Sequence, residues 1–320
     1  MLTRRRFLES ILAASTVPTT AIGNTAKRLQ RLSLQPDPDR LIDVPEGFRY
    51  DIVSRRGSSM DDGLSVPGAH DGMAAFAGDN GRVILVCNHE LTPLSDVAGP
   101  FALQLPKLPE SKKSRLYDRG SDKTPGAGGT TTTIYNPATR ETEHQFLSLG
   151  GTDINCAGGK TPWNSWLSCE ESFSAKGSGS GSHGVEIFRD CDHGYVFEVP
   201  ASARELVQAV PLRDMGRFEH EAAAVHDTSG VVYLTEDQWD SLFYRFLPNV
   251  PGELHRGGRL QALAIQDKPS ISTHNWQRQE VPIGEVFQTR WIDLHDVDSS
   301  RNDLRHRGAA DGAATFARAE

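Results

Sequence analysis

The sequence predicts an all-β protein built from repeated units of four short strands. Its apolar runs are short and rich in Val, Ile, Tyr, Phe and Thr, and Gly, Pro, Asn or Asp separate them, as is typical of strands and turns. The 30 Gly and 18 Pro among 320 residues favour many turns. The same order of strands recurs in three units. This recurrence indicates a β-propeller, whose blades are four-stranded sheets, whereas a β-sandwich is the simpler alternative.

The three units span residues 70–149, 153–212 and 218–265. Turns such as Asp79-Asn80-Gly81 separate the first two strands of a unit. Two long polar insertions, at about 91–129 and 172–193, obscure the period. Connections of this length usually form lids or binding loops, or are disordered.

The repeat ends early. A closed propeller takes four to eight blades of roughly 40–50 residues each. After the third unit the sequence contains residues 291–294 and 312–320, and the second of these segments resembles the opening strand of a fourth unit. We therefore expect an incomplete ring, from a chain that is cut short at its C-terminus.

The N-terminus resembles a twin-arginine export signal. Arg4, Arg5 and Arg6 precede Phe7-Leu8, and a short stretch of small apolar residues follows. We expect a signal peptide at 1–26 that is recognised by the twin-arginine translocase, a linker at 27–44 and the partial propeller at 45–320. The destination would be the periplasm or the exterior. This route exports folded proteins, often with a cofactor already bound.

The composition excludes several classes of partner. With 34 Lys and Arg against 42 Asp and Glu, the net charge is −8, which disfavours binding to nucleic acid. The sequence has no run of eighteen apolar residues, so we expect no membrane span. Four cysteines are too few for a disulfide scaffold at this length. We expect Cys87, Cys169 and Cys191 to be structural or in a disulfide.

Acidic residues recur at equivalent places in the units. The second strands end in Asn88-His89-Glu90, Cys169-Glu170-Glu171 and Glu236-Asp237. Equivalent positions of successive blades converge on the propeller axis, and so many carboxylates need cations to offset their charge. Oxygen donors suit Ca²⁺, and a thiolate among carboxylates suits iron. Cys156 lies beside Gly158-Gly159, whose backbone can approach a bound group closely, so we expect it to be a metal ligand. His70, His89 and His220 could be ligands or structural.

Several motifs together resemble the PhoX-type alkaline phosphatases, which are exported six-bladed propellers. They are His70-Asp71-Gly72-Met73-Ala74, Asn88-His89-Glu90-Leu91, Gly129-Thr130-Thr131-Thr132, Asn155-Cys156-Ala157-Gly158-Gly159, Thr161-Pro162-Trp163, Trp166-Leu167-Ser168-Cys169-Glu170-Glu171, His193-Gly194-Tyr195-Val196-Phe197-Glu198 and Met215-Gly216-Arg217-Phe218. The resemblance implies hydrolysis of phosphomonoesters with release of orthophosphate, at a site with Fe³⁺ and Ca²⁺ in which Cys156 binds iron.

The metal ligands expected on this basis are Asn88, Glu90, Cys156, Glu170, Glu171, Glu221, Glu236, Asp237 and Glu320. Arg217 and Arg318 are the expected catalytic residues, because a guanidinium can hold two phosphoryl oxygens as a fork. Two alternatives remain open: a lactonase-like propeller hydrolase with a single calcium ion, and a non-catalytic exported propeller that binds Ca²⁺ or a partner.

Overall fold

The computed structural model describes residues 33–93, 99–101, 108–180 and 186–319. The expected signal peptide and Glu320 lie outside these residues. The chain divides into two compact units, Met1–Ile52 and Val53–Glu320. In the first unit, β1 (Leu34–Gln35) pairs with β2 (Val44–Pro45). Within the described residues no helix is long and apolar enough to cross a membrane.

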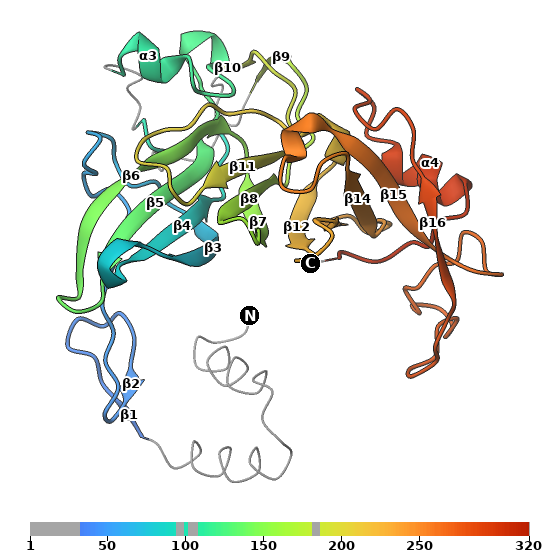
Figure 1. Cartoon of the computed structure of the whole chain (residues 1–320), viewed down its shortest axis with the longest axis horizontal. Coiled ribbons are helices and arrows are strands. Elements are labelled where there is room, and N and C mark those ends of the chain that lie inside the picture. Colours follow the sequence, from blue (N-terminus) through green and yellow to red (C-terminus); the bar gives the residue numbers. More distant parts are fainter. Residues whose placement is uncertain (1–32, 94–98, 102–107, 181–185, 320) are drawn as a thin grey trace. The chain divides into compact units, whose positions relative to one another are not determined.

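The second unit contains three antiparallel sheets that follow the predicted repeat (Figure 1). The first sheet consists of β3 (His70–Ala77), β4 (Val83–His89), β5 (Gly128–Asn136) and β6 (Glu141–Thr152). The second consists of β7 (Asn155–Lys160), β8 (Ser165–Glu170) and β11 (Val196–Pro200). The third consists of β12 (His220–Val225), β13 (Val232–Glu236), β14 (Tyr244–Pro248), β15 (Gly258–Ile265) and β16 (Thr289–Asp293). Strands that are consecutive within each sheet are paired, as in propeller blades.

Three details differ from the predicted repeat. The fourth strand of the second sheet is reduced to one bridge, between Phe197 and Pro211, whereas the third sheet gains β16 as a fifth strand. The segment expected to open a fourth unit forms isolated bridges instead, from Thr315 to Ser272 and from Phe316 to Ser241. In the described residues the helices are few and short; they are α3 (Glu110–Lys113), α4 (Leu304–Ala310), and the 3₁₀ turns η1 (Asp79–Gly81), η2 (Gly120–Asp122), η4 (Arg213–Met215) and η5 (Leu254–Arg256).

The first strands of the three sheets lie next to one another, with β7 between β3 and β12 (Figure 1). Small residues allow this approach. A Cβ atom on Gly72 of β3 would lie 2.8 Å from the Cα of Ala157, and one on Gly159 of β7 would lie 2.0 Å from the carbonyl oxygen of Ala223. The structure thus corrects our interpretation of Gly158-Gly159: a Cβ on Gly158 would also lie 1.9 Å from the Leu167 carbonyl oxygen, so both glycines admit neighbouring strands.

The hydrophobic core lies between the facing sheets. One buried cluster, which includes Phe76 and Val86 of the first sheet and Phe197 of the second, joins those two sheets. Another, which includes Leu167 of the second sheet and Phe246 of the third, joins the next pair. Since the second sheet packs against the first on one side and the third on the other, the packing fixes how the inner strand ends are placed relative to one another.

Candidate metal centre

The same irregularity occurs at the start of each of the three sheets. The first residue of each inner strand pairs with the end of the second strand: His70 with His89, Asn155 with Glu170, and His220 with Glu236. In each sheet the register then shifts before the next pairs form. Such a β-bulge redirects the side chain that it contains, and bulges are common next to active sites.

The bulged residues are Asp71, Cys156 and Glu221, each the second residue of its inner strand. A second set of acids follows the second strands, at Glu90, Glu171 and Asp237. Each of these holds the same backbone hydrogen bond, because its N–H donates to the carbonyl just before the inner strand, on Ala69, Ile154 and Glu219 respectively. The repeat therefore places two side chains per sheet in equivalent positions.

Three of these side chains converge closely. One ligand atom each from Cys156, Glu171 and Glu221 lies within 4.8 Å of the other two. Asp237 hydrogen-bonds to Glu171, and Asp71 hydrogen-bonds to Glu90. We call these six residues the acidic cluster. They come from three sheets and span 167 positions of the sequence, from 71 to 237.

The electrostatics of the acidic cluster fit a bound cation. Burial, the hydrogen bond with Asp237 and the charge of Glu221 raise the pKa of Glu171 to about 8. Burial and the neighbouring Cys169 and Glu221 also raise the pKa of the Cys156 thiol. The cluster therefore holds excess protons near neutral pH, and a cation that replaces them would favour the carboxylate and thiolate forms. A thiolate among carboxylates is a donor set suited to a transition metal, and the remaining oxygens suit Ca²⁺.

Arg318 lies at the edge of the acidic cluster. Its Nε and Nη2 atoms donate to the two carboxylate oxygens of Asp237 at 2.7 and 2.5 Å, and about half of its side chain is exposed. A planar guanidinium beside a cation site is well placed to bind an anion such as a phosphoryl group.

Arg217, in contrast, lies away from solvent and is 2% exposed. Its guanidinium donates to the carbonyl oxygens of His193, Ser174 and Ser299 at 2.9, 3.0 and 3.4 Å, and stacks on Phe173 at 4.0 Å. These contacts use its donors to join three chain segments. The prediction that Arg217 holds phosphate therefore lacks geometric support, and its position indicates a structural role.

Asn88 is fully buried, and its side-chain amide donates two hydrogen bonds and accepts two. The Nδ2 atom donates to the carbonyl oxygens of Cys156 and Ala157, while Oδ1 accepts from Trp166 and Ser168, all at 2.7 to 2.9 Å. Asn88 thus ties β4 of the first sheet to β7 and β8 of the second. It positions Cys156 through the backbone instead of offering its own oxygen to a metal.

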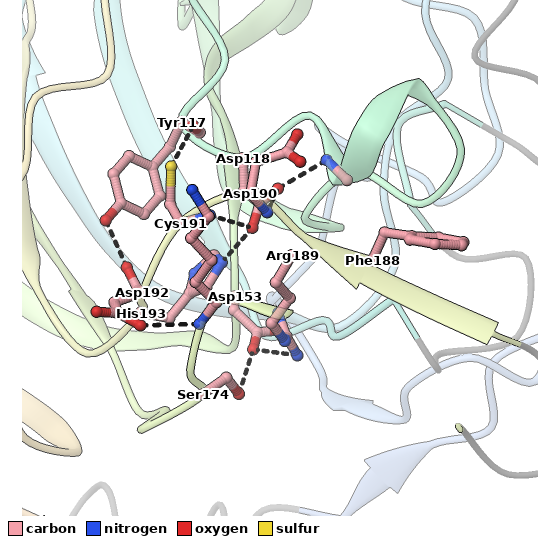
Figure 2. Close-up of polar contacts among 12 residues, drawn as sticks. Tyr117, Asp118, Asp153, Ser174, Phe188, Arg189, Asp190, Cys191, Asp192 and His193 are labelled. Atoms are coloured by element: carbon pink, nitrogen blue, oxygen red, sulfur yellow. Dashed lines mark hydrogen bonds and ion pairs between the residues drawn. The ribbon is translucent and has the colours of Figure 1, made fainter. Parts of the chain in front are cut away.

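Glu170 is fully buried at the end of β8, where it bonds to His193 of a buried polar network. Figure 2 shows His193 and its neighbours in this network. The Glu170 carboxylate accepts hydrogen bonds from the backbone N–H groups of Asp153, Gly194 and Tyr195 and from His193 Nδ1. The protein thus supplies four donors to this carboxylate. Its position argues against the expected role as a metal ligand.

His193 is the centre of this network, and sequence reasoning did not identify it as functional or structural. Its ring lies between Glu170 at 2.7 Å and Asp118 at 2.9 Å. Burial opposes a charge on this ring, but the Glu170 carboxylate and the hydrogen bond to Asp118 outweigh it, so the pKa rises to about 9. Asp118 and His193 come from the two long insertions, which pack together here (Figure 2). These insertions therefore contribute a buried core.

Glu236 is also buried. It accepts a hydrogen bond from the Tyr244 hydroxyl at 2.7 Å and lies 3.8 Å from Arg305. Burial raises its pKa to about 7. Its neighbour Asp237 reaches the acidic cluster instead. Of each acidic pair at a strand end, only the second residue therefore joins the cluster. The histidines expected as possible ligands are in protein contacts, and His89 bonds to Gly68 and Thr131.

All four cysteines lie in the described part of the chain and are free thiols, so no disulfide forms among them. Cys87 of β4 and Cys169 of β8 are both buried, which agrees with a structural role. Their positions are not equivalent, because Cys87 pairs with Met73 beyond the bulge, and Ser168 is the residue of β8 that pairs with Gly158 at the corresponding place. The Cys191 thiol contacts the Tyr117 carbonyl (Figure 2).

Comparison with known proteins adds two findings. A family model described as alkaline phosphatase PhoX matches residues 29–141 and 127–320. Among solved structures, the chain is similar to one described as Pseudomonas fluorescens PhoX in complex with vanadate, a transition state analogue, with a TM-score of 0.54 and 19% sequence identity. The similarity covers 86% of this chain and 62% of that chain, and it confirms the predicted β-propeller fold. A search of curated proteins gave no match.

Proposed function

This chain belongs to the alkaline phosphatase PhoX family, and we therefore propose that it hydrolyses phosphomonoesters and releases orthophosphate. The proposal rests chiefly on the convergence of Cys156, Glu171 and Glu221 within 4.8 Å, next to an arginine that can bind a phosphoryl group. The chain spans 62% of the length of the similar solved structure. Phosphatase activity is therefore a proposal for this protein.

We further propose that the acidic cluster holds iron and Ca²⁺, with Cys156 on iron. When bound, these cations would offset the charge of the phosphoryl oxygens and of the attacking group. The donor set supports the assignment, because a buried thiol with a raised pKa becomes a thiolate only beside a cation. Of the ligands predicted from the sequence, Glu90, Glu171, Glu221 and Asp237 join Cys156 in this proposal, and Asp71 is added.

The other residues would act on substrate or on the cluster's geometry. Arg318 would hold an equatorial oxygen of the phosphoryl group while Asp237 keeps its guanidinium in place. Asn88 would position Cys156 by holding the carbonyl oxygens of Cys156 and Ala157. Burial of Cys156 and partial burial of Glu171 exclude water from part of the cluster, and so strengthen the attraction between its charges and a cation.

We also propose that the protein reaches the periplasm or the exterior through the twin-arginine translocase. The support is the sequence Arg4-Arg5-Arg6-Phe7-Leu8 together with a site that would be loaded before export. Replacing Arg4 and Arg5 by Lys keeps the charge but removes the guanidinium groups. We expect the doubly substituted precursor to stay in the cytoplasm, and normal periplasmic recovery would contradict this route.

The metal proposal is tested by elemental analysis and absorption spectroscopy of the purified protein. We expect iron and calcium, and a visible charge-transfer band from a thiolate bound to Fe³⁺. Cys156→Ala should remove the band and most of the phosphatase activity, whereas Cys191→Ala, at a thiol outside the cluster, should change neither. A colourless protein whose activity is indifferent to chelators and to Cys156→Ala would contradict the proposal.

A further inference from the structure

Two tryptophans are exposed at one end of the third sheet. Trp239 and Trp276 are each 63% exposed, and their rings meet edge to face with centroids 5.9 Å apart. We call them the indole pair. Trp239 belongs to the connection between β13 and β14, which begins with Asp237 of the acidic cluster, and Trp276 belongs to the connection between β15 and β16. Rings of this size are mostly buried in proteins, so an exposed pair indicates a binding surface.

The backbone holds the indole pair in place. Residues 315–318 are bonded to both connections, because Arg318 N donates to Gln238 O and Thr273 N donates to Thr315 O, each at 2.9 Å. A second bond from the Thr273 hydroxyl also reaches Thr315 O at 2.9 Å. Three segments that are far apart in sequence are thus joined next to the positions that carry the two rings, and the surface is formed before any ligand binds.

Arg318 connects the indole pair with the acidic cluster. Its guanidinium carbon lies 5.7 Å from the centre of the Trp239 ring, within the range of a cation–π interaction, and its nitrogens bond to Asp237. A phosphoryl group bound by Arg318 would therefore carry its organic substituent towards Trp239. A planar aromatic substituent could then stack on an indole, whereas a short aliphatic one could not.

We propose that the indole pair binds the aromatic part of the substrate, so that the protein prefers phosphomonoesters with a planar ring, such as nucleoside monophosphates. This inference rests on the proposed phosphomonoesterase function and adds a substrate preference to it. Loss of one stacking ring typically weakens the binding of a base by about tenfold.

The test compares two substrates in three variants. For Trp239→Leu and Trp276→Leu we expect KM to rise about tenfold for adenosine 5′-monophosphate and less than twofold for glycerol phosphate. Ile283→Ser is the matched control, because Ile283 lies in the same connection as Trp276, is 97% exposed and has no ring. It should leave both KM values unchanged.

A second measurement does not depend on turnover. Adenosine 5′-monophosphate should quench the indole fluorescence of the unmodified protein in a saturable way, and Trp239→Leu should abolish most of this quenching. Equal changes of KM for both substrates, or quenching that persists in both variants, would overturn the inference. If the unmodified protein hydrolyses neither substrate, the proposed function fails, while the quenching still decides whether the indole pair binds the ring.

Discussion

Replacing Arg217 by Lys tests whether this arginine stabilises the fold or binds the phosphate of the substrate. The guanidinium of Arg217 makes two good hydrogen bonds, to the carbonyl oxygens of His193 and Ser174, and a longer one to Ser299. A lysine ammonium keeps the charge but cannot reach three carbonyls with the geometry of the fork. Hydrogen bonds from a charged group contribute about 1.5–3 kcal/mol each. With one bond kept, one good bond and the longer one are lost, so we expect the free energy of unfolding to fall by about 2–4 kcal/mol.

In a unit of this size, that loss corresponds to a fall in melting temperature of about 5–10 °C. The assay is thermal unfolding followed by circular dichroism, with KM for p-nitrophenyl phosphate measured in parallel. We expect Arg217→Lys to melt early with an unchanged KM. The matched variant Arg318→Lys removes a half-exposed guanidinium that bonds to Asp237, and this interaction contributes less than about 1 kcal/mol to stability. We expect this variant to raise KM instead. If Arg217→Lys melted normally but raised KM, the structural assignment of Arg217 would be wrong.

Two further predictions concern the packing of the sheets and the buried polar network. Gly159→Ala would place a Cβ atom 2.0 Å from the Ala223 carbonyl oxygen, so we expect a loss of about 1–3 kcal/mol in urea unfolding; Gly179→Ala, where a Cβ meets nothing within 4 Å, is the control and should lose far less. The pKa of His193 is raised from 6.5 to about 9, so its charge stabilises the fold fully below pH 6.5, and this contribution is lost as the pH rises through 9. The difference in melting temperature between the unmodified protein and His193→Gln should accordingly be largest below pH 6.5 and shrink towards pH 9, and a difference that grows with pH would contradict the assignment.

The sequence and its family resemblance were sufficient to predict the repeat and five of the six cluster residues, all except Asp71. Strand composition and turns recur with the same order in each unit, and the acids at the ends of the second strands follow from that order, whereas the bulges became visible only in the structure. Glu171 was expected from the acids at the strand ends, Cys156 from its neighbouring glycines and Glu221 from the family resemblance, and the structure brings the three together. The family resemblance agreed with this reading because its motifs fall on the same strand ends.

What sequence reasoning missed has a physical cause. Successive side chains of a strand point to opposite faces, so an error of one residue in the register exchanges the two faces. Glu170 and Glu171, or Glu236 and Asp237, could not be told apart until the pairing was known. The network of His193 and Asp118 lies in insertions that follow no period, and its partners are 75 positions apart. No local pattern predicts such a contact.

Because the β-bulge is repeated, the placement of the three bulged side chains does not depend on which donor atoms they carry. The backbone presents the second residue of each inner strand in the same way whether it is Asp71, Cys156 or Glu221. Hard and soft donors are therefore exchangeable at these positions without rebuilding a strand. A change such as Cys156→Asp would convert a mixed set of donors into an all-oxygen set. Single substitutions at these positions would therefore alter the ion preference of the proposed site while the three sheets keep their arrangement.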